Sequence, residues 1–400
     1  MYIFIPIHYC LILLIAGFCS CGIKKNNETE PQTTVKIYDN ERYTDAYEPI
    51  DLVQTTDKGF LILAERRDYQ SAFPRITILK TDEYGIFQRE SNLPDDFVNP
   101  VGKFIKTSAG YYFFCMNRLT LQSKLILVTE EGTSAEVTEL PFSYPLAASW
   151  DEASGQLMLL SYDREEKEMV VSMLNPSGQS RSQQRFSIGF GDFDAEASII
   201  KHFAGTGPRL PFFCGTNGEG LYFFNGYYRY ALSLVLYKAG TSTPQTVIYG
   251  YTDERAINSA IAASNNFAFS KSEYGSMYFI PNWENTSGVL SGSDIKGYPI
   301  PEIKENSLIT ANRLQVNGYE YVVYGSSTRN GQISLYFYTG SDKRLAGNHY
   351  LGFTNPYEIN ALVPTSDGGI AIAGQTWIAG RFSRICLFTL SKDDLSSIIH

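Results

Sequence analysis

Residues able to bind or transform a ligand recur at one position of an internal repeat. Eleven residues before each turn glycine of the repeat stand Glu48, Asn99, Tyr144, Glu196, Ser264, Ser307 and Glu358. Three carboxylates in one such set would attract a cation or a basic peptide, or would accept hydrogen bonds from sugar hydroxyls. The alternative interpretation is that polar residues simply begin strands at a solvated rim.

The repeat itself is clearest near the two ends of the chain. The stretch LVQTTDKGFLILA at 52–64 is nearly repeated as LVPTSDGGIAIAG at 362–374. Each copy is typical of a β-hairpin, with two apolar strands around a polar turn whose glycine supplies a positive φ. Looser copies occupy residues 104–116, 147–160, 202–215, 270–280 and 313–325.

A second repeated feature follows most of these hairpins, as a strand that ends in a polar turn. It occurs at 75–85, 124–132, 169–178, 233–240, 333–343 and 384–394. The turn glycines that mark the units are Gly59, Gly110, Gly155, Gly207, Gly275, Gly318 and Gly369. Most of their spacings are near the 40 to 50 residues of a four-stranded propeller blade. The long interval between the fourth and fifth glycines predicts an insertion in the fourth unit.

These spacings predict an all-β fold, a β-propeller of seven four-stranded blades. Six or eight blades are alternatives, and a pair of β-sandwiches or an open β-solenoid are other architectures. The last unit ends with its third strand, 384–390, whereas residues 35–38 alternate polar and apolar as a lone strand would. We expect Val35–Tyr38 to pair with the last blade as its missing outer strand, because this closure removes an exposed sheet edge.

The first twenty residues have the pattern of a targeting segment. The apolar run CLILLIAGFCSC, Cys10–Cys21, is followed at once by polar residues, and it is short for a spanning helix. It resembles a bacterial lipoprotein signal, with Ser20 before an acceptor Cys21, although Phe18 stands where leucine is usual. The resemblance implies a signal peptide at 1–20, acylation of Cys21, a flexible tether at 21–32 and a single propeller domain at 33–400. A plain cleaved signal or an uncleaved anchor is the alternative.

The two best-matched hairpins, with their TDKG and SDGG turns, resemble bacterial propeller repeats of extracytoplasmic lipoproteins of the Bacteroidota type. The match is close at 52–64 and 362–374 and loose across 100–350. The resemblance implies a propeller that is lipid-anchored to the outer membrane, facing the periplasm or the exterior. Propellers serve as enzymes, lectins and scaffolds, so the resemblance implies no activity.

Composition narrows the classes of function. The net charge of −9 argues against non-specific nucleic-acid binding and against docking on anionic lipid surfaces. After residue 21 the remaining cysteines, Cys115, Cys214 and Cys386, are embedded in apolar runs and read as buried hydrophobes. No metal-type spacing of cysteines occurs. We therefore expect no cofactor and no metal.

Catalytic motifs are also missing from the sequence. The histidines that follow the targeting segment are His202, His349 and His400. Neither the G-x-S-x-G motif nor the H-E-x-x-H motif occurs in the sequence. The acidic stretch GDFDAEA at 191–197 could point three carboxylates one way on a strand, but a solvated loop between units is the favoured interpretation. A serine–histidine–aspartate site built from distant loops has no support, so we expect no catalytic residues.

A second candidate binding feature is the aromatic run GLYFFNGYYRY at 220–230. If it forms an extra hairpin around Asn225 and Gly226, Tyr227, Tyr228 and Arg229 would offer an exposed platform to a sugar ring or a partner protein. The alternative is a hairpin packed against the fourth unit. Tyrosine and phenylalanine are the residues that strands pack well, so composition does not decide between the two.

The expected function is binding, as a scaffold or recognition module for a protein partner or a polysaccharide in the cell envelope. The alternative is a propeller glycan hydrolase or lyase. The residues eleven positions before the turn glycines would surround one mouth of the propeller's central channel, and their carboxylates would serve as acid and base. A glycosidase needs two carboxyl groups about 5–10 Å apart that face one cleft. A purely structural part of an envelope assembly is the third possibility.

Overall fold

A computed structural model of the chain describes residues 34–39, 44–68, 72–191, 193–206, 209–241, 243–250, 257–263, 266–378 and 382–400. The expected signal peptide at 1–20, the acceptor Cys21 and the tether lie outside the described residues. Residues Thr33–His400 form one compact unit, and the description that follows concerns this unit.

The unit is built from antiparallel sheets, each named below by its first strand in the chain. The β2 sheet contains β2 (Ala46–Gln54), β3 (Phe60–Arg67), β4 (Arg75–Thr81) and β5 (Phe87–Asn92). The β6 sheet contains β6 (Phe97–Thr107), β7 (Gly110–Asn117), β8 (Gln122–Val128) and β9 (Ser134–Ser143), and a single bridge, Arg75 with Val98, joins it to the β2 sheet. The β10 sheet contains β10 (Pro145–Asp151), β11 (Gln156–Asp163), β12 (Glu168–Leu174) and β13 (Ser180–Ser187).

The remaining sheets follow the same order, inner strand first. The β14 sheet contains β14 (Phe213–Thr216), β15 (Leu221–Tyr228), β16 (Ala231–Lys238) and β17 (Thr246–Tyr249), extended by the parallel strand β21 (Gly288–Ser291). The β18 sheet contains β18 (Ile257–Ala263), β19 (Asn266–Glu273), β20 (Ser276–Glu284) and β22 (Tyr298–Pro299). The β23 sheet contains β23 (Ile309–Val316), β24 (Tyr319–Ser327), β25 (Ile333–Thr339) and β26 (Leu345–Leu351).

The last sheet joins the two ends of the described chain. It contains β27 (Tyr357–Pro364), β28 (Ile370–Trp377), β29 (Ser383–Leu390) and β1 (Thr34–Tyr38). Strand β1 pairs antiparallel with β29, with Val35 opposite Phe388 and Tyr38 opposite Ile385. This is the pairing that the alternating pattern of Val35–Tyr38 predicted.

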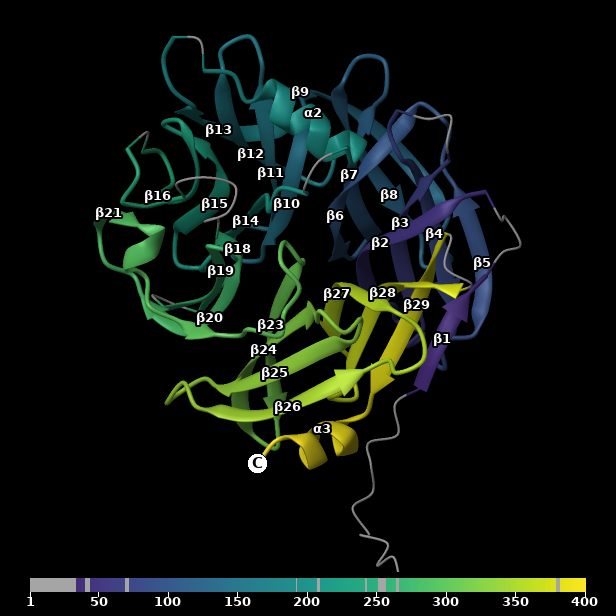
Figure 1. The fold of residues 1–400 in the computed structure, drawn as a ribbon. Helices are drawn as coiled ribbons and strands as arrows, with labels where there is room; N and C mark the ends of the chain where they lie inside the picture. Colours follow the sequence, from purple (N-terminus) through teal and green to yellow (C-terminus); the bar gives the residue numbers. More distant parts are fainter. Residues whose placement is uncertain are drawn as a thin grey trace, which may run out of the picture. The chain divides into compact units, whose positions relative to one another are not determined.

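The first strands of the sheets form a set that we call the inner ring: β2, β6, β10, β14, β18, β23 and β27. Each contacts the next in chain order, and β27 contacts β2. Figure 1 shows these strands around a common centre, with the later strands of each sheet farther out. Inner strands begin on one side of the unit, which we call the entry face. The connections between sheets and the turns between second and third strands lie on this same face.

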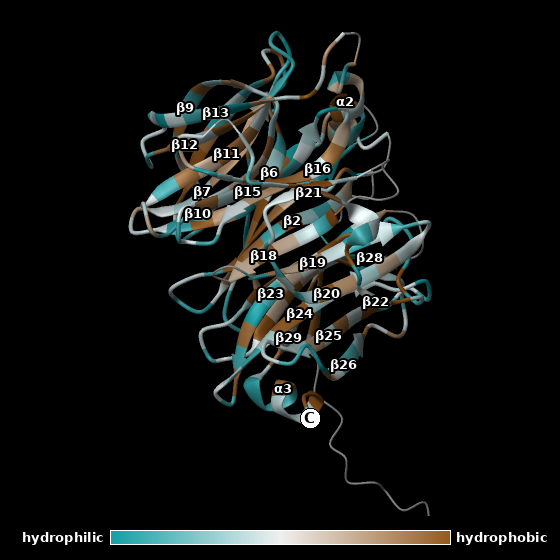
Figure 2. Cartoon of the chain, turned by 90° about the vertical axis from the view of Figure 1, so that its left-hand side faces the viewer, coloured by the Kyte–Doolittle hydropathy of each residue, from teal (hydrophilic) through white to brown (hydrophobic). Residues whose placement is uncertain are grey.

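Second and third strands carry most of the core. The second strands are buried over most of their length, for example at Phe60–Arg66 of β3 and Tyr111–Met116 of β7. The equivalent strands of the other sheets are also mostly buried. In Figure 2 these strands are predominantly brown, whereas the outer strands and turns carry more teal. The inner strands differ in exposure: Asn258–Ala263 of β18 are only half-buried, whereas β10 is buried at every residue except Trp150. Adjacent sheets thus bury each other's faces, as the stacking of repeats requires.

The repeated turn has a physical explanation that differs from the expected one. In the β2–β3 turn, the positive φ of 66° belongs to Lys58 and not to Gly59. Glycine is needed at position 59 because a Cβ there would lie 2.2 Å from the carbonyl oxygen of Thr81 on the third strand. Asp57 closes the turn by accepting a 3.0 Å hydrogen bond from the Gly59 amide. The repeated Asp and Gly are therefore structural residues.

The β27–β28 turn repeats this arrangement. A Cβ at Gly369 would lie 2.3 Å from the carbonyl oxygen of Leu390, the third-strand residue. The carboxylate of Asp367 accepts a 3.3 Å hydrogen bond from the Gly369 amide, and Gly368 has the positive φ. The two similar stretches near the ends of the chain thus form the same kind of turn, and each turn packs against the third strand of its own sheet.

The fourth and fifth units differ from the expected boundaries. Residues 196–204 form the helix α2 (Glu196–Ala204), and the first hairpin of this sheet comes later, as β14 and β15. Gly275 lies in the turn between β19 and β20, not in the first hairpin of its sheet. Gly207 lies outside the described residues. After the last strand the chain forms the helix α3 (Lys392–Ile398), which Ser391 caps.

Candidate functional site

The entry face brings together several of the residues that the repeat singled out. Glu48 lies near the start of β2 and Glu358 near the start of β27. Asn99 lies on β6, Tyr144 directly precedes β10, and Ser307 precedes β23. Glu196 departs from this pattern because it begins helix α2 instead of an inner strand. Ser264 lies outside the described residues.

A cluster of two carboxylates and two guanidinium groups forms the centre of the candidate site. The Arg209 guanidinium contacts Glu48 Oε1 at 3.1 Å and Glu65 Oε2 at 2.9 Å. Arg67 also contacts Glu65 Oε2, at 2.8 Å, and donates a 2.8 Å hydrogen bond to the carbonyl oxygen of Ala204. The Glu65 side chain is only 6% exposed, so its charge depends on these two partners.

The electrostatics of this cluster single out Glu48. Burial raises the pKa of the Glu48 carboxyl, and the nearby carboxylates of Glu65 and Glu358 add to the effect, against the lowering influence of the arginines. Burial and the same arginines lower the pKa of His202 to about 3, so its imidazole is neutral at physiological pH. His202 Nδ1 accepts a 2.8 Å hydrogen bond from the Leu210 amide, which is a structural role.

Each of the three glutamates expected at the mouth has a cationic partner. Glu48 pairs with Arg209, Glu358 with Lys304, and Glu196 with Arg164 at 3.6 Å. Gln375 Nε2 also donates a 3.0 Å hydrogen bond to Glu358. Each carboxylate of the set is therefore paired locally with a cationic side chain, and attraction of a cation, a basic peptide or sugar hydroxyls by the set stays a prediction.

The connector between the β10 and β14 sheets, of which residues 188–191, 193–206 and 209–212 are described, contacts this cluster through Ala204 and Arg209. Its helix α2 packs through Phe203, whose ring stacks on Tyr144 with the centroids 6.2 Å apart. The Tyr144 hydroxyl donates a hydrogen bond to Glu196 at the start of the same helix. Arg209 and Ala204, also in the connector, contact side chains of the β2 sheet as described above. The connector thus contacts the β2 sheet and Tyr144 beside the β10 sheet, and it leads into the β14 sheet. Figure 1 shows the position of its helix α2.

The aromatic run at 220–230 is a core strand and not an extra hairpin. Residues Leu221–Tyr228 form the continuous strand β15, and Asn225 is buried within it. The Tyr227 and Tyr228 rings are 7% and 6% exposed, so the expectation that both form an exposed platform is wrong. Arg229 lies in the following turn, with its guanidinium 5.3 Å from the Tyr228 ring centroid. Tyr230 is the residue of this run whose ring is exposed, at 52%.

Asn99 is buried at the start of the β6 sheet, and neither atom of its side-chain amide has a hydrogen-bond partner. Its φ is 52°, close to the 48° of Tyr144, which holds the matching position in the next sheet. The backbone amides of Asn99 and Tyr144 donate hydrogen bonds to the carbonyl oxygens of Pro74 and Leu121, respectively. These two acceptors directly precede strands of the preceding sheets, β4 and β8. Asn99 is therefore packed between sheets and does not reach the charged cluster through a contact of its own.

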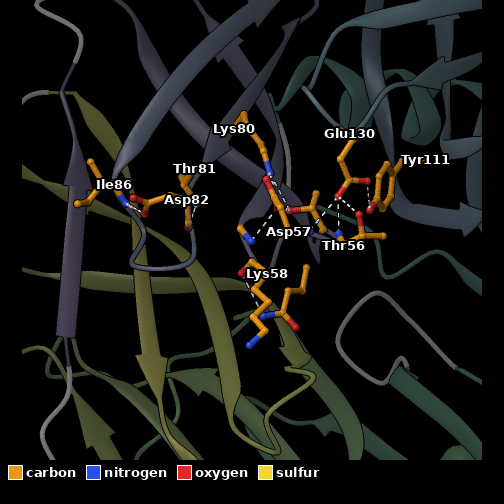
Figure 3. Close-up of polar contacts among 12 residues, drawn as sticks. Thr56, Asp57, Lys58, Lys80, Thr81, Asp82, Ile86, Tyr111 and Glu130 are labelled. Atoms are coloured by element: carbon orange, nitrogen blue, oxygen red, sulfur yellow. Dashed lines mark hydrogen bonds and ion pairs between the residues drawn. The ribbon is translucent and has the colours of Figure 1, made fainter.

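A recess lies at the opposite end of the sheets, and no pattern in the sequence indicated it. It is a cleft of about 290 Å³ between the β2–β3, β6–β7 and β8–β9 turns. Figure 3 shows Glu130 in its wall, where the carboxylate accepts hydrogen bonds from Thr56 and from the Tyr111 hydroxyl at 2.9 Å. Lys80 on the same face is 1% exposed and donates to both Asp57 oxygens at 2.8 Å. The contact between Glu130 and Thr56 joins the first two sheets, whereas the Lys80–Asp57 ion pair lies within the β2 sheet.

Two further findings concern metal binding and membranes. Within the part of the chain that the structure describes, no cluster of three or more histidine, cysteine, aspartate or glutamate side chains could hold a metal ion. None of the helices there has the length and apolarity to cross a membrane. Cys115 and Cys386 are buried and Cys214 is partly buried, as the apolar runs around them indicated.

Four-stranded antiparallel sheets around an inner ring define the β-propeller class, and this chain has that fold. No protein-family model matches it, and no curated protein does. Among solved structures, the C-terminal WD40 domain of Sif2 is 12% identical over 86% of this chain and 83% of its own, with a TM-score of 0.43. The β-propeller domain of the Trilobed protease from Pyrococcus furiosus is 9% identical over 87% and 95%, with a TM-score of 0.47. A protein of unknown function from Bacteroides caccae is 13% identical over 60% and 72%, with a TM-score of 0.34.

Proposed function

We propose that the chain is a seven-bladed β-propeller, closed by β1, that acts as a binding or scaffold module for a protein partner. We further propose that acylation of Cys21 anchors it to the outer membrane, so that the partner belongs to the cell envelope. The cyclic contacts of the inner ring and the β1–β29 pairing support the blade number and the closure. The apolar run before Cys21 supports the anchor.

The observation that carries the binding proposal is a set of exposed apolar side chains on the entry face. They lie in turns and connections of successive sheets: Leu119, Phe190, Tyr230, Tyr274, Phe353 and Ile378. Phe190 and Phe353 are more than four-fifths exposed. Large apolar and aromatic residues around a charge-paired centre have the composition of a protein interface, where they serve as anchors.

One pair of these residues is held in a fixed geometry. The Phe190 amide donates a 2.8 Å hydrogen bond to the Tyr230 hydroxyl, which links the connector to the β15–β16 turn. Gly189 allows this contact, because a Cβ there would lie 2.3 Å from the Tyr230 ring. An anchor that is already ordered loses less side-chain entropy when a partner binds.

The test is photo-crosslinking of the full-length protein in its native envelope, with a crosslinking amino acid placed at Phe190 or at Phe353. We expect adducts with the same discrete protein from both positions. Tyr319 is the matched control, since it is 70% exposed but begins strand β24, directly after the β23–β24 turn and away from the entry face. Equal adducts from Tyr319, or none from the entry face, would refute the proposal.

A glycan hydrolase or lyase is the second candidate function, and the raised pKa of Glu48 favours it. Glu48 and Glu65 share the Arg209 guanidinium, so two carboxyl groups lie in one cluster, and burial raises the pKa of one of them, Glu48. Such a pair has the chemistry of a general acid and its partner. The test is release of reducing ends from a polysaccharide panel, which Glu48→Gln should abolish if Glu48 is the acid. Absence of turnover by the wild-type protein would leave binding as the function.

A further inference from the structure

The turn between β4 and β5 presents three large apolar side chains to solvent. Tyr84, Ile86 and Phe87 are 69%, 54% and 51% exposed. Single exposed apolar residues are normal on a protein surface, but a group of them marks a contact site. The turn joins a third strand to a fourth, so it lies opposite the entry face, on what we call the exit face. It is therefore separate from the apolar anchors of the entry face.

Hydrogen bonds within the protein hold this turn in one conformation. The Asp82 carboxylate accepts from the Tyr84 amide at 2.9 Å and from the Ile86 amide at 2.8 Å, and Figure 3 shows the second of these bonds. The Gly85 amide donates to the Asp82 carbonyl oxygen at 3.1 Å. The amides of residues 84, 85 and 86 thus need no water. Backbone that enters a lipid surface must meet this condition, since an unpaired polar group there is costly.

The turn packs against β1, the first strand of the described chain. The Tyr38 hydroxyl donates a 2.8 Å hydrogen bond to the Gly85 carbonyl oxygen, and a Cβ at Gly85 would lie 3.1 Å from Lys36 Cγ. Strand β1 is antiparallel to β29, and Thr34 lies opposite Thr389, near the end of that third strand. Strand β1 therefore begins at the exit face, beside the apolar turn.

The start of β1 limits the distance between the exit face and a lipid anchor at Cys21. Thr34 stands thirteen positions after Cys21. A fully extended chain of this length spans at most about 45 Å, and a flexible one has a root-mean-square length of about 20 Å. Ile23 is the single large apolar residue at 22–33, so this segment has little with which to cover the turn. An acylated Cys21 would instead keep the turn close to lipid.

The charge of the turn selects the kind of lipid. Asp82 and Glu83 place two carboxylates beside the apolar side chains, and the whole chain has a net charge of −9. Anionic headgroups would repel both. A zwitterionic surface has no such repulsion, and a tyrosine ring such as that of Tyr84 suits the boundary between headgroups and acyl chains.

We propose that Tyr84, Ile86 and Phe87 dock the exit face on a zwitterionic phospholipid surface. This proposal rests on the proposed acylation of Cys21, because three side chains bind lipid weakly alone and stable attachment takes two contacts. Docking through the exit face leaves the entry face turned away from the membrane. The apolar anchors there stay open to a protein partner.

The experiment uses the full-length protein purified from its membrane and reconstituted into vesicles of phosphatidylcholine and phosphatidylethanolamine. Mass spectrometry first shows whether Cys21 carries acyl groups. A fluorescent amino acid then replaces either Gln88, exposed beside the turn, or Thr120, exposed in the β7–β8 turn of the entry face. We expect nitroxide-labelled lipid to quench the fluorophore at position 88 several-fold more than at position 120. Phosphatidylglycerol in the vesicles should weaken the quenching.

The decisive variant is Tyr84→Ser combined with Ile86→Ser, in the protein labelled at position 88. Phe87 is retained because it begins β5 and pairs with Thr81. The variant should lose most of the quenching, since it removes most of the apolar contact, while its Tm without lipid stays unchanged. The matched control is Val289→Ser with Tyr298→Ser, which are 68% and 49% exposed on β21 and β22 of other sheets. It should be quenched like the unsubstituted protein.

The outcomes separate failure of the docking from failure of the anchor. Absence of acyl groups on Cys21 would overturn both proposals together. With Cys21 acylated, equal quenching at positions 88 and 120, or full quenching in the Tyr84 and Ile86 variant, would overturn the docking alone. A second copy of the chain or a partner protein on the turn would give that equal quenching. Stronger quenching with phosphatidylglycerol would overturn the assignment of a zwitterionic surface.

Discussion

The Arg209 guanidinium contacts the carboxylates of Glu48 and Glu65 at 3.1 and 2.9 Å, and so joins the connector to the β2 sheet. Arg209 lies just before the β14 sheet, whereas both glutamates lie in the first sheet of the chain. A residue-to-residue contact across the entry face therefore holds elements that are more than 140 residues apart in the sequence. Glu65 is the buried member, and Arg67 is its second cation.

Replacing Arg209 by leucine should destabilise the protein by about 2 kcal/mol, because Glu65 keeps only one cation and Glu48 loses its own. This expected loss of stability is at the low end for a buried ion pair, since a third of the Arg209 side chain is exposed. Urea unfolding measures the change. The control is Arg344→Leu, whose partner Asp342 is 3.8 Å away with both side chains well exposed. That control should change stability by less than about 0.5 kcal/mol, and equal losses in both variants would contradict a structural role for the cluster.

Asp51 on β2 should make the folded protein less stable as pH rises from about 4 to about 6. Burial raises its pKa from 3.8 to about 6, against a backbone hydrogen bond from Phe104. The folded state therefore binds more protons than the unfolded state within this interval, which lowers stability as pH increases. Asp51→Asn keeps an acceptor for Phe104 and should gain about 1–3 kcal/mol at pH 7 but nothing at pH 3. Urea unfolding at several pH values tests this, and a pH-independent gain would contradict it.

Asp57 in the first turn should show the opposite pH dependence. Burial alone would raise its pKa, but hydrogen bonds from Lys80, Thr55 and Gly59 together lower it below its usual 3.8. The stabilisation is therefore complete above pH 3.8 and is lost as pH falls through the lower folded value. Asp57→Asn should destabilise at pH 7 and converge with wild type in acid. The two aspartates thus serve as controls for each other in one urea series. If both changed the free energy of unfolding in the same direction with pH, one of the two assignments would be wrong.

Truncation should have different effects in the strand part of the aromatic run, at Tyr228, and in the turn that follows it, at Tyr230. Tyr228 is 6% exposed and packs on Phe186 and Tyr249, so Tyr228→Ala should cost about 3 kcal/mol. Tyr230 is half exposed, and Tyr230→Ala should cost about 1 kcal/mol or less. Thermal unfolding with circular dichroism measures both. A larger loss for Tyr230 would mean that the turn, and not the strand, carries the packing.

Sequence patterns located most of the strands because hairpin turns are local. Asp57, Gly59, Asp367 and Gly369 each act within a few residues of their own position or on the adjacent third strand, so their spacing recurs wherever the geometry recurs. The pairing of Val35–Tyr38 could also be predicted, since one sheet lacked an outer strand and one strand lacked a sheet.

The fourth sheet and the ion pairs could not be predicted, because they depend on distant contacts. Helix α2 has only two buried residues, Ile199 and Phe203, and its position follows from Tyr144 and Arg67 elsewhere in the chain. The aromatic run was misread because Asn225–Gly226 has the composition of a turn, yet Asn225 Nδ2 is bound inside the core by Pro211 and Ile257. The cationic partners of Glu48 and Glu358, Arg209 and Lys304, likewise lie in connecting segments far along the chain, and no spacing in the sequence indicates them.

The β1–β29 pairing yields the last prediction, which concerns closure of the ring. Ile37 lies opposite Cys386 and packs against the core cluster that contains Phe388, whereas Val35 lies on the same strand and is 39% exposed. Ile37→Asp should therefore cost about 2 kcal/mol, since it places a charge against apolar side chains, and Val35→Asp should cost under about 1 kcal/mol. Hydrogen exchange of the Ile385–Leu387 amides should accelerate only in the Ile37 variant. If both variants unfold and exchange alike, β1 does not hold the last sheet, and closure must depend on the contacts between β27 and β2 instead.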